Sequence, residues 1–184
     1  MKIMVVGGGG REHAIIKKIK QSPLAEEIYV LPGNAGMHDD AVCVNIGAKD
    51  LDGIVAFAKE KKIDYAIVAP DDPLVLGAVD RLNEIGIPCF GPKANAAIIE
   101  GSKIFSKNLM KKYHIPTATY EVFTEMQAAL EYIKTVSFPT VIKADGLALG
   151  KGVVIATTLE EANEAIHSMM EDHMFGLKKE KELI

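Results

Sequence analysis

The chain contains 184 residues, of which 48% are hydrophobic and 25% are charged, a composition typical of a globular protein with one domain or two small ones. Its formal net charge of −4 gives no electrostatic reason to expect a nucleic acid or an anionic membrane surface as a partner. The sequence has no apolar run of about 18 residues that would span a bilayer. The apolar run that precedes Gly7 is too short for the core of a signal peptide. Cys43 and Cys89 lack the spacing of metal ligands. We therefore expect a cytoplasmic protein with reduced thiols.

The first half of the chain alternates between strand patterns and helix patterns. Short apolar runs predict strands over 2–6, 27–33, 41–46, 64–70 and 87–91. Amphipathic stretches predict helices over 11–22, 50–63 and 72–86. The central strands are apolar throughout rather than alternating, which is typical of strands that are buried on both faces. The pattern predicts an α/β fold in which helices cover both faces of a parallel sheet.

The pattern changes after Pro92. A helical stretch over 93–116 is interrupted at Gly101, and it is followed by predicted strands over 118–123, 139–144 and 153–156 and by helices over 125–136 and 159–173. The tail, 177–184, has no clear partner element. We predict an α/β domain over 1–92, a helical linker over 93–116 and a small α+β lobe over 117–184.

Four consecutive glycines, Gly7 to Gly10, separate the first predicted strand from the first predicted helix. They could form a tight turn, or they could expose backbone amides at a helix N-terminus, where phosphate groups bind. A dinucleotide site requires G-x-G-x-x-G and an acidic residue near the end of the second strand. Here the third glycine position holds Glu12 or His13, and the second strand ends in "YVLPGN". A smaller phosphorylated ligand therefore fits better than NAD or FAD.

Two further polar loops follow predicted strands. They are "PGNAG" over 32–36 and "PDDPL" over 70–74, and each is also compatible with an ordinary turn. Open parallel sheets bind ligands at the carboxyl ends of their strands. Three such loops at one sheet edge therefore favour a binding site.

A second glycine-rich loop lies in "KADGLALGKGVVI", over 143–155. Lys143 ends a predicted strand, and Lys151 follows Gly150 within the loop. A strand–loop–strand flap of this kind can fold over triphosphate oxygens. It is not a Walker loop, because Gly152 occupies the Ser or Thr position and a strand follows. Lys103 is a third candidate cation, although by itself it would be read as a solvated helix lysine.

These motifs together resemble those of the glycinamide ribonucleotide synthetase family, the phosphoribosylamine–glycine ligases of purine biosynthesis, which are ATP-grasp enzymes. The resemblance runs from Met1 to about Gly176 and is carried by "VVGGGGREHA", "PGNAG", "DPL", "EGSKIFSKNLMKKYHIPTATY" and "PTVIKADGLALGKGV". It implies a Rossmann-like N-terminal domain followed by an ATP-grasp small lobe. In this family, ATP phosphorylates the glycine carboxylate, and the amine of phosphoribosylamine attacks the acyl phosphate.

The resemblance also implies site residues. The implied phosphoribosylamine site consists of Gly8, Gly9, Gly10, Asn34, Asp71, Asp72, Pro73 and Leu74. The implied ATP site consists of Lys103, Lys143, Gly146, Gly150, Lys151 and Gly152. The implied partners are the small molecules phosphoribosylamine, glycine and ATP, with no nucleic acid or membrane, and no catalytic residue is assigned.

The sequence departs from the family pattern at its C-terminal end. Family members continue into a large lobe that carries the Mg²⁺ ligands and much of the glycine site, so we expect ATP and Mg²⁺ as cofactors but no metal site within these residues. Glu160, Glu161 and Glu164 share one face of a predicted helix and are interpreted as a solvated face. We therefore expect an inactive, truncated portion that could self-associate, whereas a full-length member would be monomeric. The alternatives are a non-catalytic nucleotide- or sugar-phosphate-binding fragment and another ATP-grasp carboxylate–amine ligase.

Overall fold

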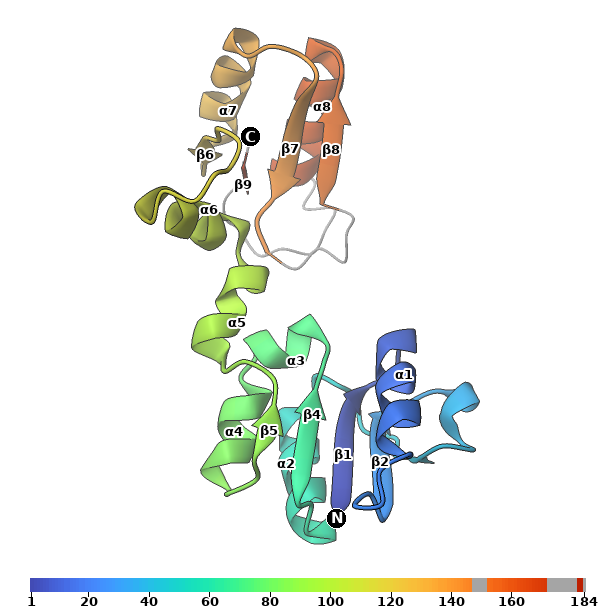
Figure 1. Cartoon of the computed structure of the whole chain (residues 1–184). Helices are drawn as coiled ribbons and strands as arrows, with labels where there is room; N and C mark the ends of the chain where they lie inside the picture. The colour runs from blue at the N-terminus through green and yellow to red at the C-terminus, as the bar shows by residue number, and fades with distance from the viewer. Residues whose placement is uncertain (147–151, 172–181, 184) are drawn as a thin grey trace. The chain divides into compact units, whose positions relative to one another are not determined.

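The computed structural model describes residues 1–146, 152–171 and 182–183 of the chain (Figure 1). The chain divides into two compact units, Met1–Ile98 and Ile99–Ile184. The division falls within helix α5 (Ala94–Gly101).

The first unit is built on a five-stranded parallel sheet with the order β3-β2-β1-β4-β5. Its strands are β1 (Lys2–Gly7), β2 (Glu27–Pro32), β3 (Val42–Cys43), β4 (Tyr65–Val68) and β5 (Cys89–Phe90). The helices of this unit before α5 are α1 (Gly10–Ile19), α2 (Leu51–Lys61), α3 (Asp71–Val75) and α4 (Ala78–Glu84), together with the 3-10 turn η1 (Ala35–Met37). This arrangement confirms the parallel α/β sheet predicted from the sequence.

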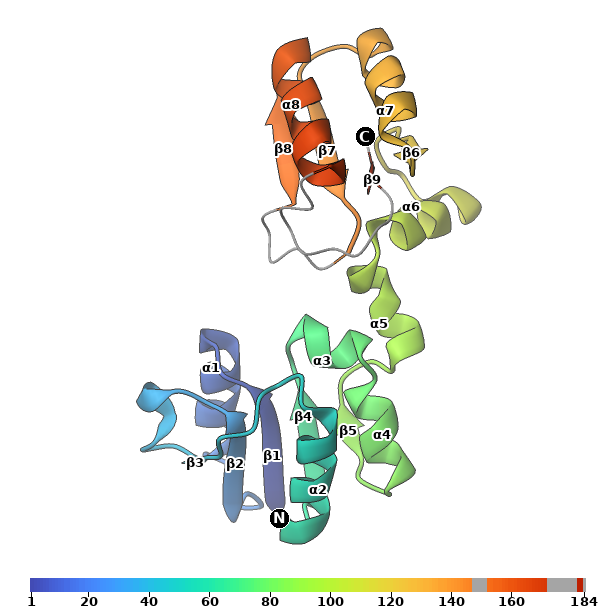
Figure 2. The same cartoon turned by 180° about the vertical axis from the view of Figure 1, so that it is seen from behind.

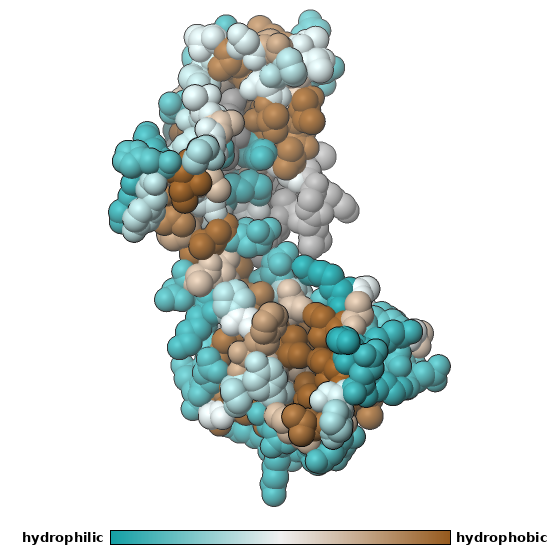
Figure 3. Space-filling view, viewed as in Figure 1, coloured by the Kyte–Doolittle hydropathy of each residue, from teal (hydrophilic) through white to brown (hydrophobic). Residues whose placement is uncertain are grey.

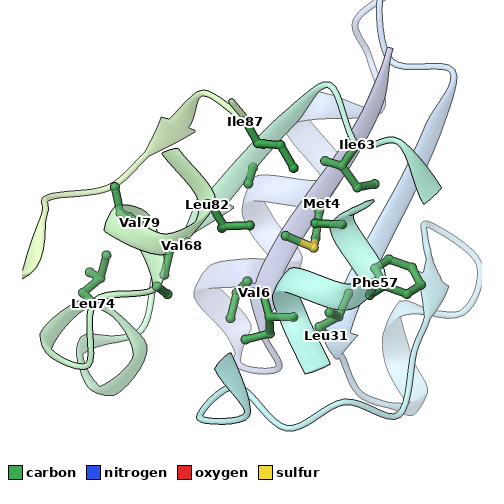
Figure 4. Packing of buried hydrophobic residues seen from close by; sticks show 14 of the residues in the cluster. Met4, Val6, Leu31, Phe57, Ile63, Val68, Leu74, Val79, Leu82 and Ile87 are labelled. Atoms are coloured by element: carbon green, nitrogen blue, oxygen red, sulfur yellow. The ribbon is translucent and has the colours of Figure 1, made fainter. Parts of the chain in front are cut away.

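Helices pack on both faces of this sheet (Figures 1 and 2). Met4 and Val6 of β1 point to one face, where they join a cluster with Phe57 of α2 and Leu82 of α4 (Figure 4). The alternate residues Ile3 and Val5 join Ile16 of α1 in a second cluster on the other face. Successive residues of a strand point to opposite faces, so the continuous apolar run of β1 is explained by two separate cores.

Two elements of the first unit differ from the sequence prediction. The helix expected over 72–86 is split into α3 and α4, because Gly77 adopts φ +89° between them. The strand expected over 41–46 pairs only at Val42 and Cys43. It lies at the sheet edge, and the chain turns away after Val44, where the Ile46 amide donates to the Val44 carbonyl at 2.7 Å.

The second unit is an α+β layer with a four-stranded sheet in the order β6-β9-β7-β8. Its elements after α5 are α6 (Lys103–Lys112), β6 (Val122–Phe123), α7 (Met126–Tyr132), η2 (Ile133–Thr135), β7 (Thr140–Ala144), β8 (Val153–Ala156), α8 (Leu159–Met170) and β9 (Glu182–Leu183). All three strand pairs are antiparallel. Ile133, Ile142 and Ile166 are fully buried in its core, where α8 and the α7–η2 segment cover one face of the sheet.

The expectation that the tail has no partner element is wrong. Glu182–Leu183 forms β9, which pairs with β6 on one side and β7 on the other, so the sheet has four strands rather than three. A two-residue strand has no readable hydrophobic period. Its pairing depends on two strands that lie about 40 and 60 residues earlier in the chain, and no local pattern contains that information.

Candidate functional site

Three loops meet at the carboxyl edge of the first sheet. The Gly33 amide donates to the Gly7 carbonyl at 3.1 Å, which joins the loop after β2 to the loop after β1. A Cβ atom on Gly8 would lie 2.7 Å from the Gly33 carbonyl oxygen, and one on Gly7 would lie 2.8 Å from Cγ of Pro70 in the loop after β4. Side chains at Gly7 and Gly8 are therefore excluded by the close approach of the other two loops.

Asn34 holds two of these loops together. Its Nδ2 donates to the Gly8 carbonyl at 2.8 Å, and its Oδ1 accepts from the Gly36 amide at 2.8 Å. Both ends of the Asn34 side-chain amide are therefore hydrogen-bonded to backbone groups. Asn34 lies at the expected site, and its observed contacts position the glycine turn.

The stretch 71–74 forms most of α3, directly after β4. Pro73 and Leu74 are buried, and Leu74 belongs to the core cluster beneath the sheet. Asp71 and Asp72 are half-buried, and Asp72 Oδ2 pairs with Lys49 Nζ at 2.6 Å. This part of the candidate site therefore offers the carboxylates of Asp71 and Asp72 to a ligand, whereas Pro73 and Leu74 are buried and hold the segment in place.

Glu12 is a site residue that the sequence interpretation missed. Its side chain is nearly buried, with 3% of the residue exposed, and it folds back over the glycine turn. Oε2 accepts a hydrogen bond from the Gly9 amide at 2.6 Å. A glutamate three residues after a helix N-cap is typical of half a capping box, and that spacing from Gly9 was the available signal.

His13 lies on α1 directly beside this turn. Its Nε2 is 2.9 Å from Asp40 Oδ2, and Lys20 Nζ is 3.1 Å from Asp40 Oδ1. The hydrogen bonds from His13 and Lys20 lower the pKa of the Asp40 carboxyl. The His13 ring therefore connects α1 to the segment before β3.

In the second unit, two candidate ATP cations lie near one another. Lys103 Nζ donates to the Gly146 carbonyl at 2.8 Å. Burial lowers the pKa of Lys103; Asp145 counteracts this effect and Lys143 adds to it. The structure thus brings Lys103 to Gly146 across about 40 residues of sequence, and Lys143 lies close enough to disfavour the charge of Lys103.

Asp145 connects the start of the glycine loop to helix α6. Its Oδ1 accepts from the Ile104 amide at 3.1 Å, and its Oδ2 accepts from Ser102 Oγ at 3.0 Å. Ser102 Oγ in turn accepts from the Phe105 amide at 3.1 Å, as an N-cap of α6. No local sequence pattern indicates this contact of Asp145 with residues 102–104.

The two ends of the glycine loop lie side by side, because the Ala144 amide donates to the Gly152 carbonyl at 2.9 Å. Gly150 and Lys151 lie outside the described residues. Lys143 pairs in register with Val153, and Val141 pairs with Ile155. Residues opposite one another in a sheet share a face, so Lys143 lies on the same face as these three apolar residues.

That face is exposed, with relative exposures of 39% for Val141, 41% for Val153 and 66% for Ile155. Hydrophobic side chains gather over β7 and β8 in Figure 3. An apolar sheet face that also carries a lysine has the chemistry to take an aromatic base on the apolar part and a phosphate at the cation.

No group of three or more His, Cys, Asp or Glu side chains that could hold a metal ion occurs among residues 1–146, 152–171 and 182–183. Glu161, interpreted from the sequence as part of a solvated helix face, accepts from the Thr157 amide at 2.7 Å and from its hydroxyl at 2.8 Å. The first of these bonds is the main cause of the lowered pKa of Glu161. In the part of the chain that the structure describes, no helix is long and apolar enough to cross a membrane.

Comparison with known proteins matches both parts of the chain to one enzyme family. The N domain of phosphoribosylglycinamide synthetase matches residues 1–100, and the ATP-grasp (A) domain of phosphoribosylglycinamide synthetase matches residues 101–184. A phosphoribosylamine–glycine ligase of Halalkalibacterium halodurans is 52% identical over 176 residues, which are 96% of this chain and 41% of that relative. The corresponding ligase of Escherichia coli K12 is 49% identical over 178 residues, 96% of this chain and 42% of the relative.

Solved structures agree with this match. The phosphoribosylamine–glycine ligase of Thermotoga maritima superposes with a TM-score of 0.79 at 34% identity and covers 100% of this chain and 43% of that one. A biotin carboxylase domain from Hydrogenobacter thermophilus, with a TM-score of 0.78 at 19% identity over 99% of this chain and 43% of that one, shares the fold. The chain thus spans about four-tenths of the length of these ligases. On the match of both parts, the chain belongs to the phosphoribosylglycinamide synthetase family.

Proposed function

We propose that this chain provides the N domain and part of the ATP-grasp domain of an ATP-dependent ligase of purine biosynthesis. The enzyme would join glycine to 5-phosphoribosylamine and release glycinamide ribonucleotide, ADP and phosphate. The observation that carries the proposal is the match of two successive domains of one synthetase, in order, along the whole chain. The ligase names of relatives near 50% identity support the same reaction.

The sugar substrate would bind at the carboxyl edge of the first sheet. The proposed site consists of Gly8, Gly9, Gly10, Asn34, Asp71, Asp72, Pro73 and Leu74, within three loops, two of which are joined by the hydrogen bonds of Gly33 and Asn34. Ligands of open parallel sheets lie at this edge. The carboxylates of Asp71 and Asp72 are suited to accept hydrogen bonds from hydroxyl or amine groups.

ATP would bind in the second unit, at Lys103, Lys143 and the loop from Gly146 through Gly150 and Lys151 to Gly152. Lysines that contact phosphoryl oxygens offset the negative charge that develops during phosphoryl transfer. The apolar face formed by Val141, Val153 and Ile155 would support the base. The described residues do not offer a fitting donor set for Mg²⁺, so no step is assigned to the metal here.

We further propose that the polypeptide 1–184 binds substrates without turning them over. The observation that favours this second function is the share of the ligases that the chain spans, between 41% and 43%. The test is phosphate release with ATP, Mg²⁺, glycine and phosphoribosylamine, scored only where it depends on both acceptors. We expect no such release, and turnover on the order of 1 s⁻¹ would contradict this proposal.

Binding tests the site assignment independently of turnover. Ribose 5-phosphate should shift the amide resonances of residues 8–10, 34 and 71–74, whereas ATP should shift those around Lys103 and Lys143. NAD is the control ligand for the first site, because the acidic residue that holds its ribose is missing after β2. Stronger shifts with NAD than with ribose 5-phosphate would refute the sugar-phosphate assignment.

A further inference from the structure

The glycine turn of the first unit contains the buried carboxylate side chain of Glu12. Glu12 uses one carboxylate oxygen to accept from the Gly9 amide. Its other oxygen, Oε1, is buried and has no hydrogen-bond partner among the described residues. Nε of Arg11 lies 3.7 Å from Oε1, and the Arg11 side chain is 66% exposed. Neither the proposed sugar-phosphate site nor the proposed ATP site gives this carboxylate a role.

The Glu12 side chain accounts for much of the glycine content of the turn. A Cβ on Gly7 would lie 2.6 Å from Glu12 Cγ, and one on Gly9 would lie 2.9 Å from Glu12 Oε2. Gly8 is excluded from bearing a side chain by Gly33, whereas a Cβ on Gly10 would meet nothing within 4 Å. Three of the four glycines therefore make room for neighbouring groups of the protein itself, without any ligand.

The same carboxylate occupies the feature that would attract a phosphate. Anions bind helix N-termini through free backbone amides and the positive end of the helix dipole. At the start of α1, the carboxylate of Glu12 already takes the Gly9 amide. A phosphate at this turn would compete for that amide and lie close to a poorly solvated like charge, which is unfavourable.

We infer that Glu12 is a specificity-determining positioning residue that keeps phosphate away from the α1 turn. A sugar phosphate at this edge then has to place its uncharged hydroxyl- or amine-bearing end against Gly8 to Gly10 and its phosphate elsewhere. This orientation rests on the proposed function, since it assumes that a sugar phosphate binds at this edge. The exclusion of anions from the turn does not depend on that assumption.

The test is a titration of the 184-residue chain with inorganic phosphate, followed through the amide resonances of Gly8 to Gly10. Glu12→Gln retains an oxygen that can accept from the Gly9 amide but removes the charge. Over the same range of phosphate concentration, we expect no saturable shift in the unsubstituted chain and a saturable shift in Glu12→Gln. This difference corresponds to a phosphate affinity that is higher in the variant by about tenfold or more. The exchange rate of the Gly9 amide in Glu12→Gln checks that the cap is retained.

Glu161→Gln is the matched control. It neutralises another glutamate that accepts from a backbone amide at the start of a helix, and it changes the net charge equally, but it lies in the second unit. It should leave the phosphate response of Gly8 to Gly10 unchanged. If Glu161→Gln gained the same response, bulk charge rather than Glu12 would be the cause, and the inference would be overturned.

Two further outcomes would overturn the inference: saturable phosphate binding at Gly8 to Gly10 in the unsubstituted chain, and a lack of phosphate binding in Glu12→Gln. A parallel titration with ribose and ribose 5-phosphate separates this inference from the proposed function. If neither sugar shifts the edge while phosphate behaves as expected, the sugar-phosphate site fails and the anion exclusion stands.

Discussion

The two glycine-rich loops of this protein differ in the charges that surround them. The loop after β1 is closed over the buried carboxylate of Glu12. The loop after β7 begins beside Lys103 and Lys143, with Asp145 as counter-charge. Both loops follow apolar strands and would be read from sequence as phosphate cradles. The comparison indicates that the glycines allow other groups to approach the backbone closely. The sign of the nearby charge then favours or disfavours binding of the phosphate part of a ligand at each loop.

The largest expected effect concerns the need for glycine in the first loop. Gly7→Ala should destabilise the first unit by about 3 kcal/mol, because Gly7 has φ +126° and its Cβ would meet Glu12 and Pro70. Gly10→Ala is the matched control, since a Cβ there meets nothing within 4 Å, and it should change stability by less than about 1 kcal/mol. Denaturant unfolding followed through β1 amide resonances measures both. Equal effects would show that the loop is not closed over Glu12.

A smaller effect is expected from the counter-charge of the second loop. Asp145→Asn should weaken the bonds to Ile104 and Ser102, and amide exchange at Ile104 should accelerate roughly tenfold. Glu131→Gln is the control, because Glu131 is exposed and, among the residues that the structure describes, pairs only with groups on its own helix and the following turn. It should leave the exchange of Ile104 unchanged. Unaltered exchange in Asp145→Asn would mean that this carboxylate does not anchor α6.

The charge of Lys103 provides a pH-dependent test. Burial lowers its pKa, whereas the hydrogen bond to Glu60 raises the pKa of Lys61 in the first unit. Acetic anhydride should therefore modify Lys103 at lower pH than Lys61, and ATP should protect Lys103. Since the folded-state pKa of Lys103 lies below its unfolded value, the unfolded chain binds more protons between the two values. The contribution of Lys103 to stability therefore rises with pH through that range. Modification of Lys103 only at a pH above that at which Lys61 reacts would contradict the lowered pKa of Lys103.

The smallest expected effect concerns the apolar face beside Lys143. Ile155→Thr should change stability by no more than about 0.5 kcal/mol because Ile155 is 66% exposed. It should weaken ATP binding by roughly threefold, since the substitution removes apolar area from the proposed base site. Ile142→Thr on the buried face is the contrasting variant and should instead destabilise the second unit. Unchanged ATP affinity in Ile155→Thr would place the base elsewhere.

The sequence was sufficient to predict the parts of the fold that depend on local pattern. Continuous apolar runs such as 2–6 correctly indicated a doubly covered parallel sheet. The pairing of Glu182–Leu183 with β6 and β7 was not predictable, because a two-residue strand has no period and its partners are distant in sequence. The break between α3 and α4 arises from the positive φ of Gly77. A single glycine within a helical pattern does not by itself predict such a break.

For the candidate site, sequence reasoning identified the loops but not their chemistry. Gly8 and Asn34 lie at one sheet edge as expected, and a hydrogen bond joins them. Glu12 was noted only as a residue that breaks a dinucleotide motif, because its burial depends on how three loops close. Asp145 likewise gains its role from a contact with Ser102, 43 residues away.

The most direct test of the contrast between the two loops is one titration of the 184-residue chain with ATP, observed at both loops by amide resonances. The charges around the loops predict saturable shifts at Lys103, Lys143, Gly146 and Gly152, with none at Gly8, Gly9 and Gly10. Saturable shifts at Gly8 to Gly10 with an unperturbed second loop would contradict the account, because the triphosphate would then prefer the loop that holds the buried carboxylate.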